Sequence, residues 1–213
     1  MGFVEVLKKR AKENIKTIVL PETEDMRTLE ATDKILKEGV AKIVLIGNEE
    51  TIKAKAAEGG FDISGATIVD PETSDRTQAY IDKFVELRAK KGMTPEKAKE
   101  ILHTQYPYYG VMMVKMGDAD GMVSGACHST ADTLRPCLQI LKTKPGTKLV
   151  SAFFLMVVPN CEYGANGAFV FADSGLNQNP TPEELSAIAA SSAESFQLLV
   201  QEEPIVAMLS HST

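Results

Sequence analysis

The stretch that decides the fold is Lys16–Gly47, KTIVLPETEDMRTLEATDKILKEGVAKIVLIG. It begins and ends with a short apolar run, and between these runs apolar residues recur at helical spacing as far as Gly39. An apolar strand, an amphipathic helix and a second apolar strand in this order indicate a βαβ unit, whose two strands are parallel. The pattern therefore predicts an α/β fold, a three-layer sandwich with a parallel sheet between helices.

Helices and strands continue to alternate around this unit. A first helix is expected over Phe3–Glu13, and a third helix and a third strand follow as NEETIKAKAAEGG and ATIVD. Three further helices are expected, one over Ser74–Gly92, one through His103 and one across YPYYGVMMVKMG. A strand DGMVSG and a helix ADTLRPCLQILK then complete the first predicted domain, residues 1–146.

The sequence pattern changes after residue 146, from alternating helices and strands to two apolar runs joined by a turn-forming segment. The apolar runs VSAFFLMVVP and GAFVFAD are separated by the turn-forming NCEYGANG, and we expect both to be strands of a second domain, residues 147–213. Thr181 and Glu184 predict a capping box that begins the last helix. The segment PIVAML is typical of a buried parallel strand, and without a covering helix such a strand leaves one sheet face bare. We therefore expect the chain to be truncated at its C-terminus.

The composition is that of an ordinary globular protein, with 44% apolar and 24% charged residues. The net charge of −6 argues against a nucleic-acid partner, which would need a clustered basic surface. No segment reaches the roughly 18 apolar residues of a membrane span and no cleavable leader is recognisable, so we expect a cytoplasmic protein without a membrane partner. The three cysteines have no CxxC spacing, which argues against a disulfide framework and a structural zinc site.

The segment Gly121–Pro136, GMVSGACHSTADTLRP, contains the ingredients of an anion site. Ser124 and Gly125 end a predicted strand, and a glycine there lets the backbone approach a ligand closely. Ser129 is placed to cap the next helix, whose first amides and macrodipole attract phosphate. Arg135, in the first two turns of that helix, can grip a phosphate or carboxylate with two hydrogen bonds. The alternative is an ordinary capped helix with a surface arginine.

Other reactive or charged side chains have simpler explanations. Cys127 and His128 are neighbours in sequence, and neighbouring side chains tend to point apart, so a Cys–His nucleophile pair is not expected. Cys161 follows a predicted strand in a turn, where a reactive thiol or a packed one fits. Arg88 ends a long helix, where a solvated basic residue interacts favourably with the helix dipole. The three histidines show no metal-ligand spacing, and the sequence contains no nucleotide-loop, zinc-protease, serine-hydrolase or calcium-loop motif.

Three segments taken together resemble one known family. They are KTIVLPETEDMRTLEA, KMGDADGMVSGACHSTADTLRPCLQILKTKPG and VSAFFLMVVPNCEYGANGAFVFADSGLNQNPT, and the resemblance runs in order from Lys16 to the last residue. The chain is similar in these segments to the phosphate acetyl/butyryltransferase family. The phosphate acetyltransferases are the most similar branch, and the phosphate butyryltransferases are the nearest alternative.

The resemblance implies an enzyme that converts acetyl-CoA and phosphate to CoA and acetyl phosphate, in either direction. It also implies a two-domain α/β subunit related to isocitrate and isopropylmalate dehydrogenases, an active site between the domains and a homodimer. In the scheme proposed for the family, an aspartate takes the proton of the CoA thiol, the thiolate attacks acetyl phosphate directly and a serine stabilises the oxyanion. CoA and acetyl-CoA are then substrates, and neither a metal nor a permanently bound cofactor is needed.

Carried over residue by residue, the resemblance assigns Ser129, Thr130 and Arg135 to the phosphoryl group and Arg88 to CoA. It places Cys161 near the site without a nucleophilic role. Arginines and helix amides are needed there because the reaction brings negative charges together. The family's serine and aspartate lie in a later DLSRG segment that is absent from these 213 residues. We therefore expect no catalytic residue in this chain and no turnover by this chain alone.

Two other functions compete with this one. A non-catalytic interaction module would retain a CoA or phosphate pocket and dimerise with or regulate a complete enzyme. A dehydrogenase of the related fold is disfavoured, because no paired aspartates are placed to bind the divalent metal that such enzymes use.

Overall fold

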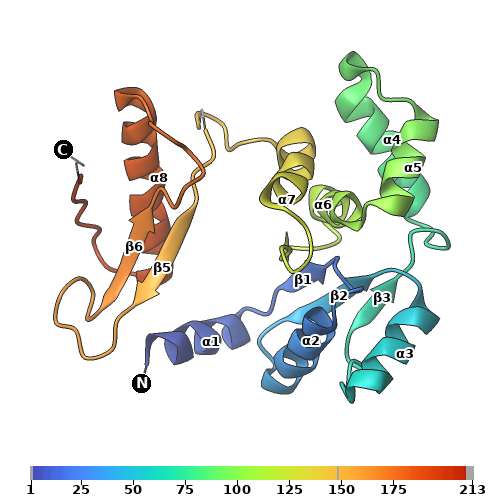
Figure 1. Cartoon of the computed structure of the whole chain (residues 1–213), viewed down its shortest axis with the longest axis horizontal. Coiled ribbons are helices and arrows are strands. Elements are labelled where there is room, and N and C mark those ends of the chain that lie inside the picture. The colour runs from blue at the N-terminus through green and yellow to red at the C-terminus, as the bar shows by residue number, and fades with distance from the viewer. Residues whose placement is uncertain (1, 148, 210–213) are drawn as a thin grey trace. The chain divides into compact units, whose positions relative to one another are not determined.

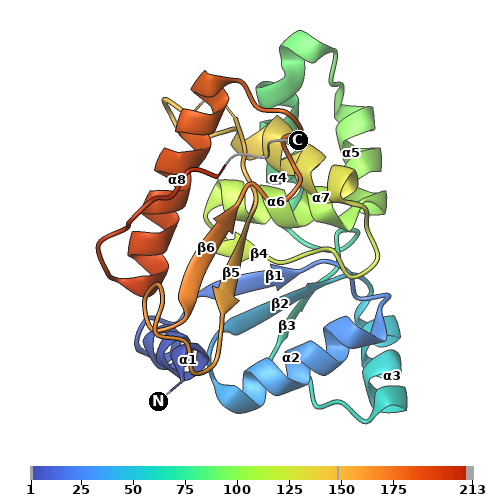
Figure 2. The same ribbon diagram turned by 60° about the vertical axis from the view of Figure 1, so that its left-hand side comes forward.

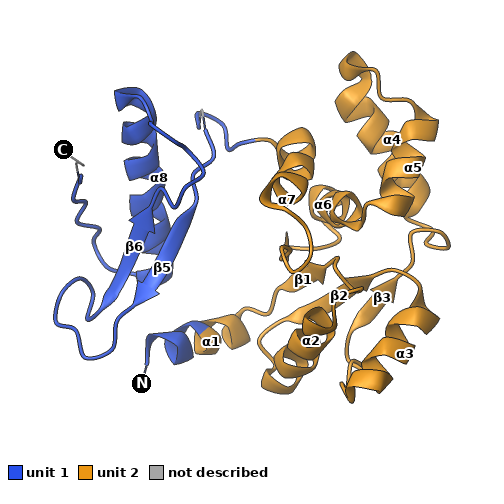
Figure 3. Cartoon of the chain, in the orientation of Figure 1, with its two compact units in different colours: residues 1–7, 143–213 blue, residues 8–142 orange. Residues whose placement is uncertain are grey.

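The structure is a computed structural model that describes residues 2–147 and 149–209. Its architecture is α/β, as expected (Figure 1). The described residues group into two compact units, one formed by Lys8–Lys142 and the other by residues within 1–7 and 143–213 (Figure 3). The domains expected over 1–146 and 147–213 stay a prediction, as does the two-domain dehydrogenase-like architecture.

A four-stranded parallel sheet forms the centre of the larger unit, in the order β3-β2-β1-β4. Its strands are β1 (Thr17–Leu20), β2 (Lys42–Ile46), β3 (Thr67–Val69) and β4 (Gly121–Met122). The expected parallel sheet is confirmed in this unit. β4 is shorter than the expected strand DGMVSG, because the backbone beyond Val123 donates its N–H groups to the loop after β1 instead of to a neighbouring strand.

Helices cover both faces of this sheet, with α2 and α3 on one face and α4, α5 and α6 on the other (Figures 1 and 2). The helices of the larger unit are α2 (Met26–Glu38), α3 (Glu49–Gly59), α4 (Thr77–Arg88), a short 3-10 turn (Ala89–Lys91), α5 (Pro95–Thr104), α6 (Tyr106–Met116) and α7 (Thr130–Pro136). α1 (Phe3–Glu13) precedes β1. Within the part of the chain that the structure describes, no helix has the length and apolarity of a membrane span.

Alternate residues of the central strand β2 face opposite layers. Ile43 and Leu45 belong to the core that contains residues of α2 and α3, whereas Val44 and Ile46 belong to the core that contains residues of α4, α5 and α6. All four are at most 6% exposed. A strand buried on both faces needs apolar residues at every position, which explains the continuous run KIVLI. The three-layer sandwich is therefore confirmed for this unit.

The helix expected over ADTLRPCLQILK is present but divides at Pro136. α7 ends there, and a π-helical turn follows over Cys137–Leu141, closed by a bond from the Lys142 N–H to the Cys137 carbonyl at 3.0 Å. Proline has no N–H to donate to the preceding turn, so the regular ladder is interrupted at this point.

The smaller unit contains an antiparallel hairpin of β5 (Phe153–Val157) and β6 (Ala168–Ala172), with α8 (Pro182–Val200) against β6. The capping box at the start of α8 is confirmed. Glu184 donates its N–H to Oγ1 of Thr181 at 3.3 Å, and Thr181 donates its N–H to the Glu184 carboxylate at 2.8 Å.

The strand expected at PIVAML is wrong for residues 204–209, which have no regular structure. Ile205 is 97% exposed. A parallel strand is held by hydrogen bonds to a neighbouring strand, and the β5–β6 hairpin provides no third strand within the described residues. Residues 210–213, expected to begin a loop, lie outside the described residues.

Candidate functional site

The sheet of the larger unit changes its direction of growth between β1 and β4. The chain adds β2 and β3 on one side of β1 and then places β4 on the other side. At such a switch point the loops leave adjacent strands in opposite directions, and α/β proteins bind ligands in the crevice between them. The loop after β1 and the loop after β4 meet there through Glu22 and residues 125–128. The candidate site is built from these two loops.

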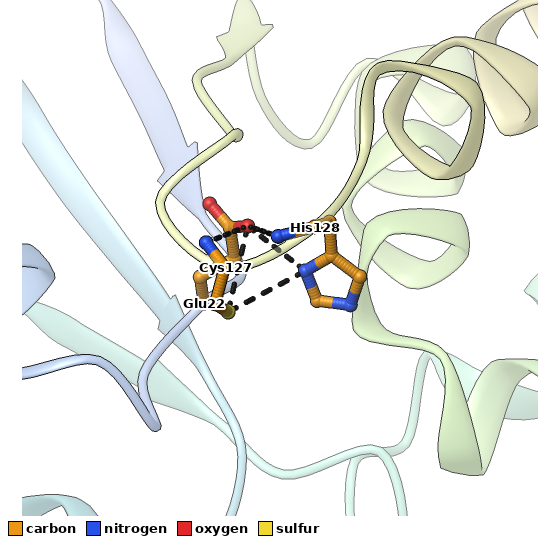
Figure 4. Close-up of side chains that lie close together, drawn as sticks. All are labelled: Glu22, Cys127 and His128. Atoms are coloured by element: carbon orange, nitrogen blue, oxygen red, sulfur yellow. Dashed lines mark hydrogen bonds and ion pairs between the residues drawn. The ribbon is translucent and has the colours of Figure 1, made fainter.

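Glu22 fills the concave side of the loop after β4. Its carboxylate accepts hydrogen bonds from four consecutive backbone N–H groups, those of Gly125 (2.6 Å), Ala126 (2.8 Å), Cys127 (3.0 Å) and His128 (2.9 Å). The Nδ1 atom of His128 lies 2.8 Å from the same carboxylate (Figure 4). Successive N–H groups that converge in this way form an anion-binding nest. The anion here is a side chain of the protein, 2% exposed.

The hydrogen bonds keep Glu22 ionised. Burial alone raises the pKa of this carboxyl group, but the hydrogen bonds from Cys127, Ala126, His128 and Gly125 outweigh burial and hold the pKa well below its usual range. Sequence reasoning missed Glu22, because an acidic residue in PETED reads as part of a solvated loop. Its partners lie 103 to 106 positions later in the chain.

The side chains of Cys127 and His128 approach each other although they are neighbours in sequence. The Cys127 Sγ atom lies 3.6 Å from Nδ1 of His128 and 3.6 Å from Oε1 of Glu22. Glu22 draws both side chains to the same oxygen (Figure 4). The reason for not expecting a Cys–His pair, that the two side chains point apart, is therefore wrong.

Electrostatics nevertheless make Cys127 a poor nucleophile. Burial, followed by the hydrogen bond and charge of Glu24 and those of Glu22, raises the pKa of the Cys127 thiol to about 12. Its Sγ atom lies 3.3 Å from Oε1 of Glu24. Since the thiolate is the nucleophilic form, a thiol with this pKa reacts slowly at neutral pH. This supports the expectation that Cys127 and His128 are not a nucleophile pair.

Ser129 begins α7, as the sequence predicts. Its Oγ atom accepts the Asp132 N–H at 3.2 Å and donates to Oδ2 of Asp132 at 2.6 Å, so the N-cap is confirmed. Thr130 is the first helical residue and is exposed. The Asp132 carboxylate already supplies the negative charge that a helix N-terminus favours, so a phosphate that binds Ser129 must displace it.

The charges of Arg88 and Arg135 both affect the pKa of Tyr108, a residue of α6. Burial raises the pKa of Tyr108, while the positive charges of Arg135 and Arg88 lower it. Both guanidinium groups therefore lie close enough to Tyr108 for their charges to affect its pKa. α4 carries Arg88 and α7 carries Arg135, and both helices contact α6, which carries Tyr108. Sequence reasoning missed Tyr108, since YPYYG reads as core helix.

The two arginines differ in their surroundings. Arg135 is exposed, and its ion pair with Asp132 is long, 3.5 Å. Arg88 is half-buried, and its Nε atom is fully buried with no hydrogen-bond partner among the described residues. A buried N–H without an acceptor costs about 1 to 3 kcal/mol, so a ligand oxygen that reaches this N–H gains a bond. Arg88 is therefore not simply a solvated residue at a helix end.

Ser124 and Gly125 lie next to the nest. Gly125, a glycine expected to let the backbone approach a ligand, donates its N–H to Glu22. Gly125 has a φ of 121°, a conformation that side chains disfavour, so a glycine is required at this turn. The Ser124 Oγ atom is buried and has no partner among the described residues. The substrate contacts expected of both residues stay predictions.

A cavity of about 580 Å³ opens beside the two loops. Glu24, Lys55, His103, Tyr106 and His128 are among its lining residues. Its volume is in the range of small-molecule sites, roughly 300 to 1,000 Å³. None of the residues expected to bind phosphate or CoA lines it.

Cys161 belongs to the smaller unit, in the connection between β5 and β6. Its Sγ atom lies 3.9 Å from the carbonyl oxygen of Tyr163, and the side chain is half-buried. Its expected place near the site stays a prediction.

One cluster within the described part of the chain offers metal ligands. The ligand atoms of Glu22, Cys127 and His128 all lie within 4.8 Å of one another. Spacing along the chain predicts no metal site here, because Glu22 is remote in sequence from Cys127 and His128.

Residues 2–213 match a protein-family model described as phosphate acetyl/butaryl transferase. The phosphate acetyltransferase of Acetivibrio thermocellus is 56% identical over 213 residues, and that of Thermoanaerobacterium thermosaccharolyticum is 54% identical over the same length. Both alignments cover 100% of this chain and 63% and 64% of the respective relatives. The chain thus spans less than two thirds of the length of these relatives.

Solved structures show the same fold. The EutD phosphotransacetylase from Staphylococcus aureus is 36% identical with a TM-score of 0.84, and a phosphotransacetylase from Streptococcus pyogenes is 38% identical with a TM-score of 0.84. Each comparison covers 93% of this chain and 58% of the solved chain.

Proposed function

The chain belongs to the phosphate acetyl/butaryl transferase family, and on this premise we propose that the protein moves an acetyl group between CoA and inorganic phosphate. The reaction is acetyl-CoA plus phosphate giving CoA plus acetyl phosphate, and its reverse. Relatives at 51% to 56% identity are named phosphate acetyltransferase, which favours acetyl over butyryl as the group transferred.

The family match over residues 2–213 supports this proposal, and Arg88 and Arg135, whose charges both reach Tyr108, are the groups that we assign to the anionic substrates. Arg135 has a long ion pair, 3.5 Å to Asp132, and the buried Nε atom of Arg88 has no hydrogen-bond partner among the described residues. Acetyl phosphate and CoA both carry phosphate groups, which arginine binds through two parallel hydrogen bonds. The exposed Arg135 suits the phosphoryl group of acetyl phosphate, and the buried Nε of Arg88 suits CoA.

Charge balance explains what these residues contribute to the transfer. The CoA thiolate attacks the carbonyl carbon of acetyl phosphate, the carbon–sulfur bond forms, and the bond to the phosphate oxygen breaks. Both reactants are anionic, so Arg135, Ser129 and the first amides of α7 lower the repulsion as they approach. The proton of the thiol goes to a carboxylate base, and this base belongs to the DLSRG region, which these 213 residues do not contain.

The remaining properties follow from the same family membership. We propose that the protein acts as a cytoplasmic homodimer, that acetyl phosphate, phosphate and CoA are its small-molecule partners, and that the reaction uses neither a metal nor a permanently bound cofactor. The chain described here supplies binding groups, and we expect it to show no turnover without the family's serine and aspartate.

Calorimetric titration of the 213-residue chain with CoA, and separately with acetyl phosphate, tests the binding half of the proposal. We expect Arg88→Ala to weaken CoA binding and Arg135→Ala to weaken acetyl phosphate binding, each by about tenfold or more. Lys34→Ala is the charge-matched control, because Lys34 lies on α2 and pairs with Glu30. Equal affinities in all variants would contradict the assignment.

A non-catalytic binding module is the second candidate. It predicts that CoA binds to the chain and that the natural gene product containing this chain still fails to form acetyl-CoA from acetyl phosphate. Formation of acetyl-CoA by that gene product excludes it.

A further inference from the structure

A thiol, an imidazole and two carboxylates meet at the junction of the loops after β1 and β4. Oε1 of Glu22 lies 2.8 Å from His128 Nδ1 and 3.6 Å from Cys127 Sγ, and these two atoms are 3.6 Å apart (Figure 4). Oε1 of Glu24 lies 3.3 Å from the same sulfur. None of these side chains is assigned a contact with substrate in the proposed transfer reaction.

The distances from Cys127 Sγ to its three neighbours are those of the edges of a tetrahedral metal site. Zinc binds sulfur at about 2.3 Å and nitrogen or oxygen at about 2.0 to 2.2 Å, so neighbouring ligands in a tetrahedron are roughly 3.3 to 3.6 Å apart. The three sulfur edges, 3.6, 3.6 and 3.3 Å, already lie in this range. The 2.8 Å separation of Oε1 and Nδ1 is a hydrogen bond, which opens by about half an ångström when a metal replaces the hydrogen.

The carboxylates of the cluster and the hydrogen bonds that orient Glu22 also favour binding of a cation. Glu22 and Glu24 contribute two carboxylates, and no lysine or arginine forms a described ion pair with either of them. The backbone bonds from residues 125–128 fix the orientation of Glu22, as outer-shell partners do in metal sites. Cys127 is exposed and 29% of the His128 side chain is exposed, so an ion can enter from solvent.

We propose that Cys127, His128 and Glu22 bind a divalent cation of zinc-like softness, with water in the fourth position. Sulfur and imidazole ligands in this geometry select zinc over magnesium or calcium. On binding, the thiol proton of Cys127 passes to solvent, a sulfur–metal bond forms, and His128 carries its hydrogen on Nε2. The metal ties the end of β1 to the start of α7, so it stabilises the fold. The site is independent of the proposed transfer reaction, which needs no metal.

Titration of the metal-free chain with Co²⁺, a spectroscopic substitute for zinc, tests the site directly. We expect one Co²⁺ per chain, thiolate-to-cobalt charge-transfer absorption and the intense visible bands of tetrahedral cobalt, with displacement by Zn²⁺. Cys127→Ser should abolish the charge-transfer band, and His128→Asn should weaken binding by about tenfold or more. Cys161→Ser is the matched control and should bind as the wild type does. An unchanged spectrum in Cys127→Ser, or only the weak spectrum of octahedral cobalt in the wild type, would overturn the proposal.

Alkylation of the wild-type chain gives a second test that needs no variant. We expect Zn²⁺ to protect Cys127 from iodoacetamide, mapped by mass spectrometry, and to leave alkylation of Cys161 unchanged. Thermal melting should shift upward with Zn²⁺ in the wild type and in Cys161→Ser, but not in Cys127→Ser. The exposure to iodoacetamide is long enough for the metal-free chain to be modified at Cys127 in spite of its high thiol pKa. Equal modification of Cys127 with and without Zn²⁺ after that exposure would refute the site.

Discussion

The Glu22 carboxylate contacts His128 at two atoms. It accepts a hydrogen bond from the His128 backbone N–H at 2.9 Å and lies 2.8 Å from Nδ1 of the imidazole. A residue directly after β1 thus fixes both the backbone and the imidazole of a residue 106 positions later. Because Ser129 follows immediately and caps α7, Glu22 also sets where the N-terminus of α7 lies. The proposed phosphoryl site therefore depends on a carboxylate that does not touch the substrate.

Glu22→Gln should destabilise the chain strongly. The amide is the same size, but its NH₂ group cannot accept the N–H groups that converge on the carboxylate, so buried donors lose their partner. Lost hydrogen bonds to a charged group cost about 1.5 to 3 kcal/mol each, and local relaxation reduces the sum, so we expect a loss of about 2 to 4 kcal/mol in the free energy of unfolding. Urea unfolding followed by far-ultraviolet circular dichroism measures it.

Glu30→Gln is the control for this substitution. Glu30 forms an exposed ion pair with Lys34 on α2, and such pairs contribute about 0 to 1 kcal/mol. If Glu22→Gln is no more destabilising than Glu30→Gln, the nest does not hold the two loops together.

Asp173 makes the free energy of unfolding of the smaller unit depend on pH in the acid range. Burial raises its pKa, but hydrogen bonds from the Asn177 side chain and backbone, the Leu176 N–H and Ser151 outweigh burial and lower the pKa to about 2. An unfolded aspartate has a pKa of about 3.9, so the contribution is present above that pH and is lost as the pH falls toward 2. After a discount for partial exposure, the contribution of Asp173 to the free energy of unfolding is about 1 to 2 kcal/mol.

Asp173→Asn measures this contribution. We expect the wild type to be more stable than the variant at pH 6, and the difference to shrink steadily between about pH 4 and pH 2. Urea unfolding at several pH values gives the difference. A gap between the two proteins that stays constant over this range would show that Asp173 does not carry the pH dependence.

Cys127 should be unusually slow to alkylate in the metal-free chain. Its thiol pKa of about 12 leaves roughly a thousandfold less thiolate at neutral pH than an ordinary cysteine has. The measurement is the iodoacetamide rate at Cys127 by mass spectrometry, with a chelator present and an unstructured cysteine peptide as reference. A rate within tenfold of the peptide would show that Glu24 and Glu22 do not suppress the thiolate.

Local rules recovered much of the fold. The N-cap at Ser129 and the capping box of Thr181 depend on side chains within three residues, and both are present. Apolar runs on β1 and β2 correctly indicated strands covered on both faces. The segment PIVAML satisfied the same local rule and failed, because a strand also needs a neighbour that the local sequence does not provide.

The candidate site was predicted only in part. The substrate roles of Arg88 and Arg135 stay predictions, and the effect of their charges on Tyr108 depends on how α4, α6 and α7 pack. Glu22 was missed because its partners are 103 or more positions away, and the nest it fills was taken for a ligand site. Both features arise from tertiary packing, which spacing along one sequence does not reveal.

The formation of acetyl-CoA from acetyl phosphate and CoA by the natural gene product that contains this chain tests the central claim most directly. We predict that the wild-type protein forms the thioester and that Arg135→Ala lowers kcat/KM for acetyl phosphate by about 100-fold, while Lys34→Ala leaves it unchanged. A wild-type protein that forms no acetyl-CoA, or an Arg135→Ala variant within twofold of wild type, would contradict the account.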